Sequence, residues 1–86
     1  MYKLLLRKRA LKDLELLQKA GLVKKAVELK EILRANPFQN PPPYEKIICE
    51  GEAAYSRRIN VQHRLVCKVD KEQLLVSILR MWTHYE

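Results

Sequence analysis

Two short runs of alternating apolar and polar residues, on either side of residues 60–62, constrain this chain more than any other feature. Successive side chains of a strand point to opposite faces, so Arg57 and Arg58 are expected on opposite faces of the first run. Arg64 and Lys68 are expected on one face of the second run. The polar residues between the runs predict a tight connection. The pattern therefore predicts an antiparallel hairpin on which Arg58 and Arg64 can lie side by side, a surface suited to an anion.

The length and charge of the chain limit what it can do. With 86 residues, we expect a single domain spanning 1–86. The net charge of +7, from 17 Lys and Arg against 10 Asp and Glu, favours an acidic partner such as nucleic acid or an acidic protein. No apolar run approaches the ~20 residues of a membrane span, and Leu4–Leu6 precedes Arg7–Arg9, the reverse of a signal peptide. We therefore predict a cytoplasmic protein with no membrane partner.

The two cysteines do not suggest a metal site or a disulfide framework. Cys49 and Cys67 form no CxxC pair and have no histidine at ligand spacing, so both are expected to be buried as small hydrophobic residues. The chain also lacks a P-loop, a GxGxxG motif and a Ser-His-Asp pattern. The sequence therefore predicts no metal and no cofactor.

The order of periodic segments predicts an α+β fold. Leucines at helical spacing stop at Gly21, resume directly after it and end before Pro37. The proline run at 41–43 is expected to deliver Tyr44 and Glu45 to a defined place. Helices grouped on one side of an antiparallel sheet of about four to five strands give the α+β class. We expect a strand at 2–6, helices at about 8–20 and 22–35, and strands around 47–48, within 53–59, within 63–69 and at 74–79.

A carboxylate, several arginines and a terminal histidine are the groups that metal-independent RNA cleavage needs. A base takes the proton of the 2′-hydroxyl, cations hold the phosphate, and an acid protonates the departing 5′-oxygen. Spacing alone does not separate this enzyme class from a binding module. Both readings stay open at this point.

Three motifs carry a resemblance to a known family. The run YSRRINVQHRLV at 55–66, the NPF at 36–38 and the terminal WTHYE at 82–86 resemble the Txe/YoeB branch of the RelE superfamily of bacterial toxin-antitoxin toxins. The resemblance covers nearly the whole chain. It implies a helical hairpin on a twisted antiparallel sheet. It also implies a toxin that acts as a ribosome-dependent mRNA endoribonuclease (mRNA interferase), cuts the message in the A site and inhibits translation.

The resemblance also implies roles for single residues. Glu45, seven residues past Phe38, falls on the general base of the family, and Arg64 falls on the arginine that binds the phosphate in the transition state. His84 falls on the general acid. The substrate-binding residues implied are Arg58, which supports Arg64, and Tyr85, which contacts the substrate nucleotide. We also expect Arg57, the neighbour of Arg58, to bind substrate.

The partners follow from the same resemblance. They are a cognate antitoxin of the Phd/YefM type, the ribosome with its mRNA, and operator DNA bound through the antitoxin; a homodimer is also open. The alternative hypothesis is a catalytically silent module of the same fold that binds antitoxin, DNA or ribosome. A third hypothesis is a ribonuclease that needs no ribosome.

Overall fold

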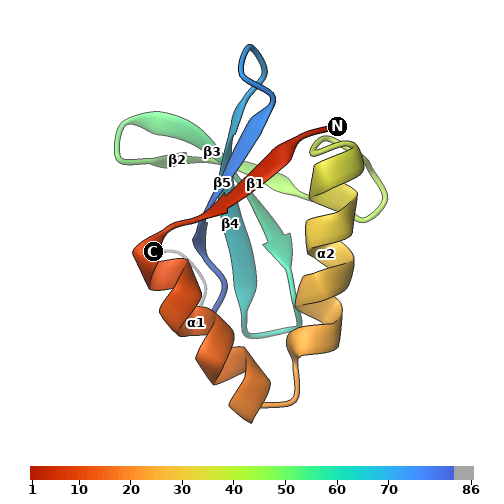
Figure 1. Ribbon diagram of the computed structural model, residues 1–86, viewed down its shortest axis with the longest axis vertical. Coiled ribbons are helices and arrows are strands. Elements are labelled where there is room, and N and C mark those ends of the chain that lie inside the picture. The colour runs from red at the N-terminus through yellow and green to blue at the C-terminus, as the bar shows by residue number, and fades with distance from the viewer. Residues whose placement is uncertain (83–86) are drawn as a thin grey trace.

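The structure, a computed structural model, describes residues 1–82, and its elements follow the order β-α-α-β-β-β-β. In the view of Figure 1, the two helices stand to the lower left and to the right of the strands of a twisted sheet. The elements are β1 (Lys3–Leu6), α1 (Lys8–Lys19), α2 (Val23–Ala35), β2 (Glu45–Cys49), β3 (Glu52–Arg58), β4 (Arg64–Asp70) and β5 (Leu75–Arg80).

The five strands form one sheet in the order β1-β5-β4-β3-β2. The four strands after the helices are joined by short turns and pair antiparallel with their sequence neighbours. The first strand adds to the far side of β5 in parallel. The α+β class and the helical hairpin are confirmed, and the one parallel pair makes the sheet mixed rather than wholly antiparallel.

Two glycines act where the backbone needs a positive φ. Gly21 (φ +73°) ends α1, and the amides of Gly21 and Leu22 donate to the carbonyls of Gln18 and Leu17, the paired bonds that close a helix C-terminus. Gly51 (φ +77°) follows Glu50 (φ +55°) in the two-residue turn between β2 and β3. Two consecutive positive φ values match the right-handed twist of the flanking strands, so this turn holds a tight hairpin.

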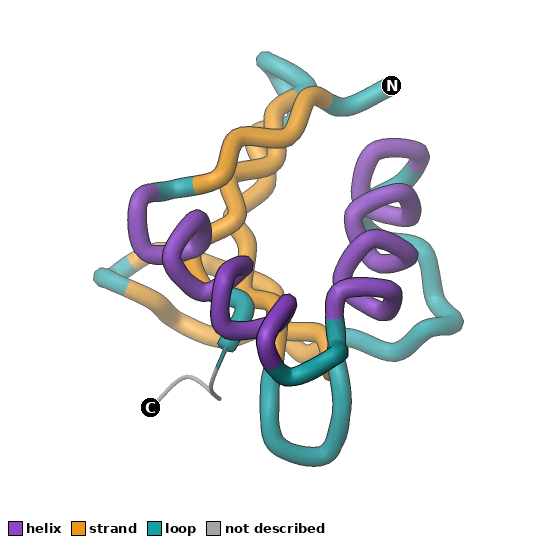
Figure 2. The backbone as a smooth tube through the Cα atoms, turned by 60° about the horizontal axis from the view of Figure 1, so that its bottom comes forward, coloured by secondary structure: helices purple, strands orange, loops and turns teal. Residues whose placement is uncertain are grey.

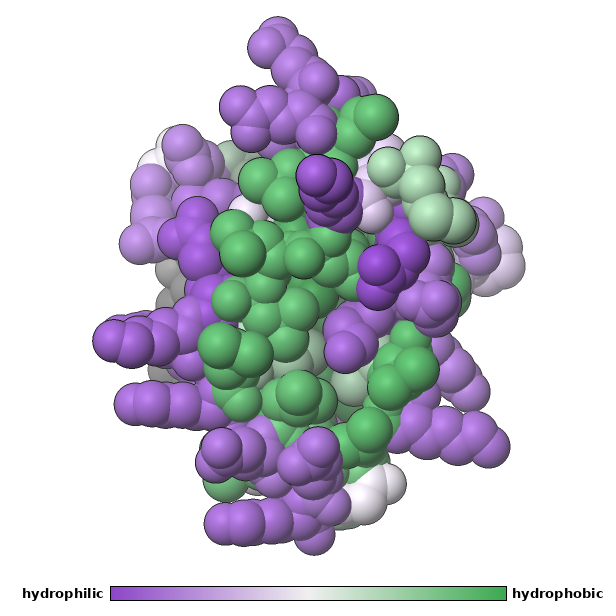
Figure 3. Space-filling model, in the orientation of Figure 1, coloured by the Kyte–Doolittle hydropathy of each residue, from purple (hydrophilic) through white to green (hydrophobic). Residues whose placement is uncertain are grey.

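The main core lies between the helices and one face of the sheet. Buried side chains of both helices pack there against the inward residues of β4 and β5, and Figure 2 shows both helices flanking the strands. In the orientation of Figure 1, apolar side chains gather in a band down the middle of the surface with hydrophilic ones on both flanks (Figure 3). The buried members of this core are Ala10, Leu17, Ala26, Leu29, Leu33, Ile59, Leu65, Cys67, Val76, Ile78 and Met81. We call the opposite face of the sheet the open face.

A buried carboxylate ties the first helix to the end of the last strand. Asp13 of α1 is 4% exposed, and its Oδ2 accepts hydrogen bonds from Arg80 Nε at 2.8 Å and from the Met81 amide at 2.9 Å. The hydrogen bond to Asp13 raises the pKa of the Arg80 guanidinium, which stays charged. This contact joins residues far apart in the chain, and no local sequence pattern predicts it.

Replacing Asp13 by alanine is expected to lower the free energy of unfolding by about 2 kcal/mol, because it leaves a buried amide and a charged guanidinium without their acceptor. Urea denaturation followed by circular dichroism measures this. Asp13→Asn keeps an acceptor for the Met81 amide and should lose less. Equal midpoints for the parent chain and Asp13→Ala would contradict the assignment.

No helix within residues 1–82 combines the length and the apolar character needed to cross a membrane.

Candidate active site

The two arginines of the hairpin lie side by side on the open face. β3 and β4 pair with Arg58 directly opposite Arg64, as the alternation of the sequence predicted. The connection between the strands is held by the side chain of Asn60, whose Oδ1 accepts hydrogen bonds from the amides of Gln62 and His63. Two guanidinium groups therefore stand at the same end of the sheet.

Glu45 joins the arginines from the neighbouring strand. It is the first residue of β2 and pairs with Ser56, one strand away from Arg64. The Glu45 Oε1 atom lies 3.4 Å from Arg64 Nη1, and the Ser56 hydroxyl lies 3.5 Å from the same nitrogen. The Glu45 side chain is 65% exposed and that of Arg64 is 23% exposed. A carboxylate and a guanidinium thus meet at a surface that a substrate can reach.

Arg57, the neighbour of Arg58, is buried on the other side of the strand. It is 1% exposed, and its guanidinium donates to the carbonyl oxygens of Pro42 at 2.6 Å, Gln39 at 2.8 Å and Pro37 at 3.0 Å. Its Nε has no hydrogen-bond partner in the described part of the chain. Burial lowers the pKa of this guanidinium, which remains charged. Arg57 therefore holds a loop and offers no donor to a phosphate on the open face, unlike the role the resemblance suggested.

The loop held by Arg57 leads directly into Glu45. The Arg57 guanidinium carbon also lies 4.8 Å from the ring centroid of Tyr44. Tyr44 packs edge-on against Phe38 and Tyr55, with ring centroids 6.3 and 5.8 Å away. The proline run therefore delivers Glu45 to a defined place, because the residue before it is clamped by a cation and two rings.

The described chain ends beside the start of β4. The Trp82 ring stacks on His63, with ring centroids 3.9 Å apart and an angle of 20° between planes. His63 is 6% exposed, and within residues 1–82 its Nδ1 has no hydrogen-bond partner. The predicted general acid, His84, and the predicted nucleotide contact, Tyr85, lie outside the described residues.

Solved toxin structures share this fold over nearly the whole chain. A heterotetrameric YoeB-YefM toxin-antitoxin complex from Staphylococcus aureus contains a chain 32% identical to this one, with a TM-score of 0.75 and 99% of both chains covered. The YoeB dimer from Staphylococcus aureus is 30% identical over 98% of both chains, with a TM-score of 0.81. The chain belongs to the YoeB family. It is therefore a toxin of the RelE superfamily, which confirms the resemblance found in the sequence.

A YoeB/ParE toxin from Agrobacterium tumefaciens has the same fold with lower identity. It is 26% identical, with a TM-score of 0.84 and coverage of 96% of this chain and 99% of that one. No protein-family model and no curated protein sequence matches the chain.

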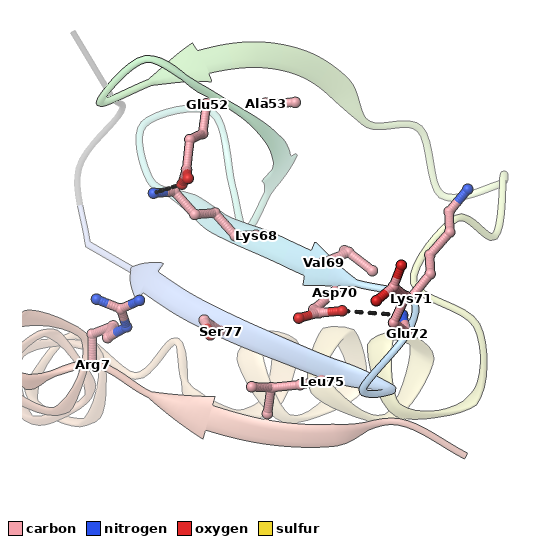
Figure 4. A pocket seen from close by; sticks show the side chains of 10 residues that line it. All are labelled: Arg7, Glu52, Ala53, Lys68, Val69, Asp70, Lys71, Glu72, Leu75 and Ser77. Carbon is pink, nitrogen blue, oxygen red and sulfur yellow. Dashed lines mark hydrogen bonds and ion pairs between the residues drawn. The ribbon is translucent and has the colours of Figure 1, made fainter.

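This YoeB-family chain carries a second charged group on the open face, which the sequence analysis missed. Lys68 of β4 donates to Glu52, the first residue of β3, at 2.7 Å (Figure 4). It also lies 3.5 Å from Glu50 of the β2–β3 turn. The hydrogen bond between them lowers the pKa of Glu52 and raises the pKa of Lys68. Alternation placed Lys68 on the face of Arg64, but only the pairing of β3 with β4 brings Glu50 and Glu52 to it.

The cysteines of this YoeB-family chain are free and buried, as predicted. Cys67 faces the main core, and burial raises the pKa of its thiol to about 12. A thiol of this kind is an inert packing residue rather than a nucleophile. Among residues 1–82, no group of three or more His, Cys, Asp or Glu side chains gathers closely enough to hold a metal ion.

Proposed function

We propose that this YoeB-family toxin is a ribosome-dependent endoribonuclease that cuts mRNA in the A site. The observation that carries the proposal is the Glu45–Arg64 pair, 3.4 Å apart on the open face with Arg58 directly across from Arg64. This arrangement sets a potential base beside two phosphate-binding groups. Arginine suits that task because its planar fork donates two parallel hydrogen bonds to phosphate oxygens and keeps its charge.

In the proposed reaction, the Glu45 carboxylate accepts the proton of the 2′-hydroxyl, whose oxygen then attacks the adjacent phosphorus. Arg64 and Arg58 stabilise the negative charge that builds on the phosphate oxygens. His84 donates a proton to the 5′-oxygen as its bond to phosphorus breaks, which leaves a 2′,3′-cyclic phosphate and a 5′-hydroxyl. His84 and Tyr85 enter this proposal through the family resemblance of the terminal residues. The end of the described chain at Trp82, against the neighbour of Arg64, supports the choice.

The Glu45–Arg64 contact also explains why the toxin would need a ribosome. The Glu45 side chain is mostly exposed, and the carboxylate faces an open surface rather than an enclosed cleft. Cleavage in line requires that the 2′-oxygen, the phosphorus and the leaving oxygen be held in one geometry. We propose that the A site holds the message in this geometry, and that the toxin supplies the acid, the base and the cations.

We further propose an acidic antitoxin as the partner that neutralises the toxin. A chain 30% identical to this one, with 99% of both covered, comes from a YoeB-YefM complex from Staphylococcus aureus. The net charge of +7 favours an acidic partner for this chain as well. A second copy of the chain is another candidate partner, since the similar Staphylococcus aureus YoeB was solved as a dimer.

The test is primer extension on a defined mRNA incubated with the chain, with and without programmed ribosomes. We expect the extension to stop at a new 5′ end of the message within the A-site codon. This stop requires ribosomes and is lost in Glu45→Gln and His84→Ala. Cleavage of naked RNA at a similar rate would replace the proposal with a free ribonuclease. No cleavage in either mixture, with antitoxin binding retained, would replace it with a silent binding module.

A further inference from the structure

Three consecutive basic residues stand at the junction of β1 and α1. Arg7, Lys8 and Arg9, which we call the basic corner, are exposed, and none of them forms an ion pair within the part of the chain that the structure describes. The proposed reaction does not use them. Neighbouring like charges repel one another, and an anion that binds between them relieves this repulsion.

The basic corner borders a hollow on the open face. A cavity of about 480 Å³ is lined by the basic corner together with Cys49, Glu50, Leu79 and Arg80. A second hollow of about 730 Å³ shares Arg7 and continues over Lys68 and Ser77 (Figure 4). In Figure 4 the Arg7 side chain rises from the β1–α1 junction toward β5. Arg7 therefore joins two hollows. The larger one is also lined by the carboxylates of Glu52, Asp70 and Glu72, so the smaller one is better suited to a phosphate group and its sugar.

The basic corner and the proposed active site lie at two ends of the same face. Cys49, on the floor of the smaller hollow, is four residues along β2 from Glu45 and points to the same side of the sheet, a distance of about 13 Å at ~3.3 Å per residue. Between the two ends lies a small apolar cluster. Its members are Cys49, Ala54, Val66, Ile47 and Leu79.

The other cations that line the two hollows beside β4 and β5, Lys68 and Arg80, are already in ion pairs, whereas within the described residues the basic corner is not. Lys68, which also lines the larger hollow, is held by Glu52 and Glu50. Arg80 is held by Asp13. The one carboxylate at the smaller hollow, Glu50, is turned to Lys68 at 3.5 Å. An anion that enters this hollow therefore meets the basic corner first.

We propose that the basic corner is a second RNA phosphate site, which holds the backbone of the RNA away from the cleaved bond. An RNA strand across the open face would place one phosphate at Arg58 and Arg64 and another at the basic corner. This proposal rests on the proposed function, because the path of the RNA strand is drawn from the proposed active site. The chemistry it names, an RNA phosphate, can come from the message or from ribosomal RNA.

The test measures binding of a 2′-O-methyl oligouridylate, which cannot be cleaved because its 2′-oxygen carries no proton. The variant carries Arg7→Ser, Lys8→Ser and Arg9→Ser, and serine at the position before α1 also suits a helix start. The control carries Lys19→Ser, Lys24→Ser and Lys25→Ser, three exposed lysines at the far end of the helices, with the same loss of charge. Affinity is measured against salt, since each lost phosphate contact lowers the slope of log K against log salt by ~0.7.

We expect the basic-corner variant to bind about tenfold more weakly than the control, with a slope smaller in magnitude by ~0.7 for one lost phosphate contact. Equal affinity and slope for the two variants, with both the oligonucleotide and the small ribosomal subunit, would overturn the proposal, since net charge alone would then account for binding. The same pair is titrated against the small ribosomal subunit. Weaker binding to the oligonucleotide assigns the message strand, and weaker binding to the subunit alone assigns ribosomal RNA.

Cleavage by the same variants separates this proposal from the proposed function. A basic-corner variant that cleaves as well as the control at every ribosome concentration would overturn the second site and leave the nuclease assignment standing. A parent chain that never cleaves but binds the oligonucleotide through the basic corner would retain the site and remove the nuclease assignment.

Discussion

Replacing Arg64 by alanine is expected to lower the single-turnover rate of A-site cleavage by about 10²- to 10³-fold without unfolding the chain. The guanidinium lies 3.4 Å from Glu45 Oε1 and 3.5 Å from Ser56 Oγ, at the point where the proposed reaction builds charge on the phosphate. Its loss removes a donor that is worth most when that charge is greatest. Primer extension on programmed ribosomes, sampled over time, measures the rate.

Two further variants sharpen this result. Arg64→Lys keeps the charge but loses the planar fork, so we expect an intermediate rate. Lys46→Ala is the matched control, because Lys46 is exposed on the strand of Glu45 but points to the opposite side of the sheet. Unchanged cleavage by Arg64→Ala, or an equal loss in Lys46→Ala, would contradict the role of Arg64.

Replacing Arg57 by alanine is expected to lower the free energy of unfolding by about 3–5 kcal/mol. The change leaves the buried carbonyl oxygen of Pro37 and the part-buried ones of Gln39 and Pro42 without this donor, and removes the cation packed against Tyr44. Domains of this size are stable by only about 5–15 kcal/mol in total, so the chain would be close to unfolding. The urea midpoint, followed by circular dichroism, measures the loss.

Arg58→Ala is the control that the chain itself offers. Arg58 is the next residue, is exposed and points to the open face, so its removal should change stability by no more than about 0.5 kcal/mol. It should, however, reduce cleavage, because Arg58 faces Arg64 across the hairpin. The expected results for the two neighbouring arginines are therefore opposite. Equal stability of Arg57→Ala and Arg58→Ala would show that the buried guanidinium does not hold the loop.

Local signals predicted most of the fold. The helix stop at Gly21 is where the sequence placed it, because a positive φ is a local property of a few residues. The direction of β1 was not predicted. Its residues suit a strand of either direction, and its partner, β5, lies at the other end of the chain.

The features of the candidate site also divide into those that local sequence predicted and those that it did not. The meeting of Arg58 with Arg64 followed from alternation and a short connection, both of which are local. The roles expected for Glu45 and Arg64 came from the family resemblance. Their contact was found only in the structure, since it crosses from β2 over β3 to β4. The ion pairs of Lys68 and Asp13 were missed, because each joins segments whose closeness depends on how the sheet and helices assemble.

Arg57 and Arg58 show the limit of what the sequence by itself determines. The two-residue period of a strand determined that these neighbours point to opposite faces, since that geometry needs only the backbone. Only the tertiary structure decided that the face of Arg57 is the one closed by the 37–42 loop and the core, so that one arginine holds a loop and the other faces a substrate. Burial depends on contacts with segments that are distant in the sequence, so the pattern within one strand does not predict it.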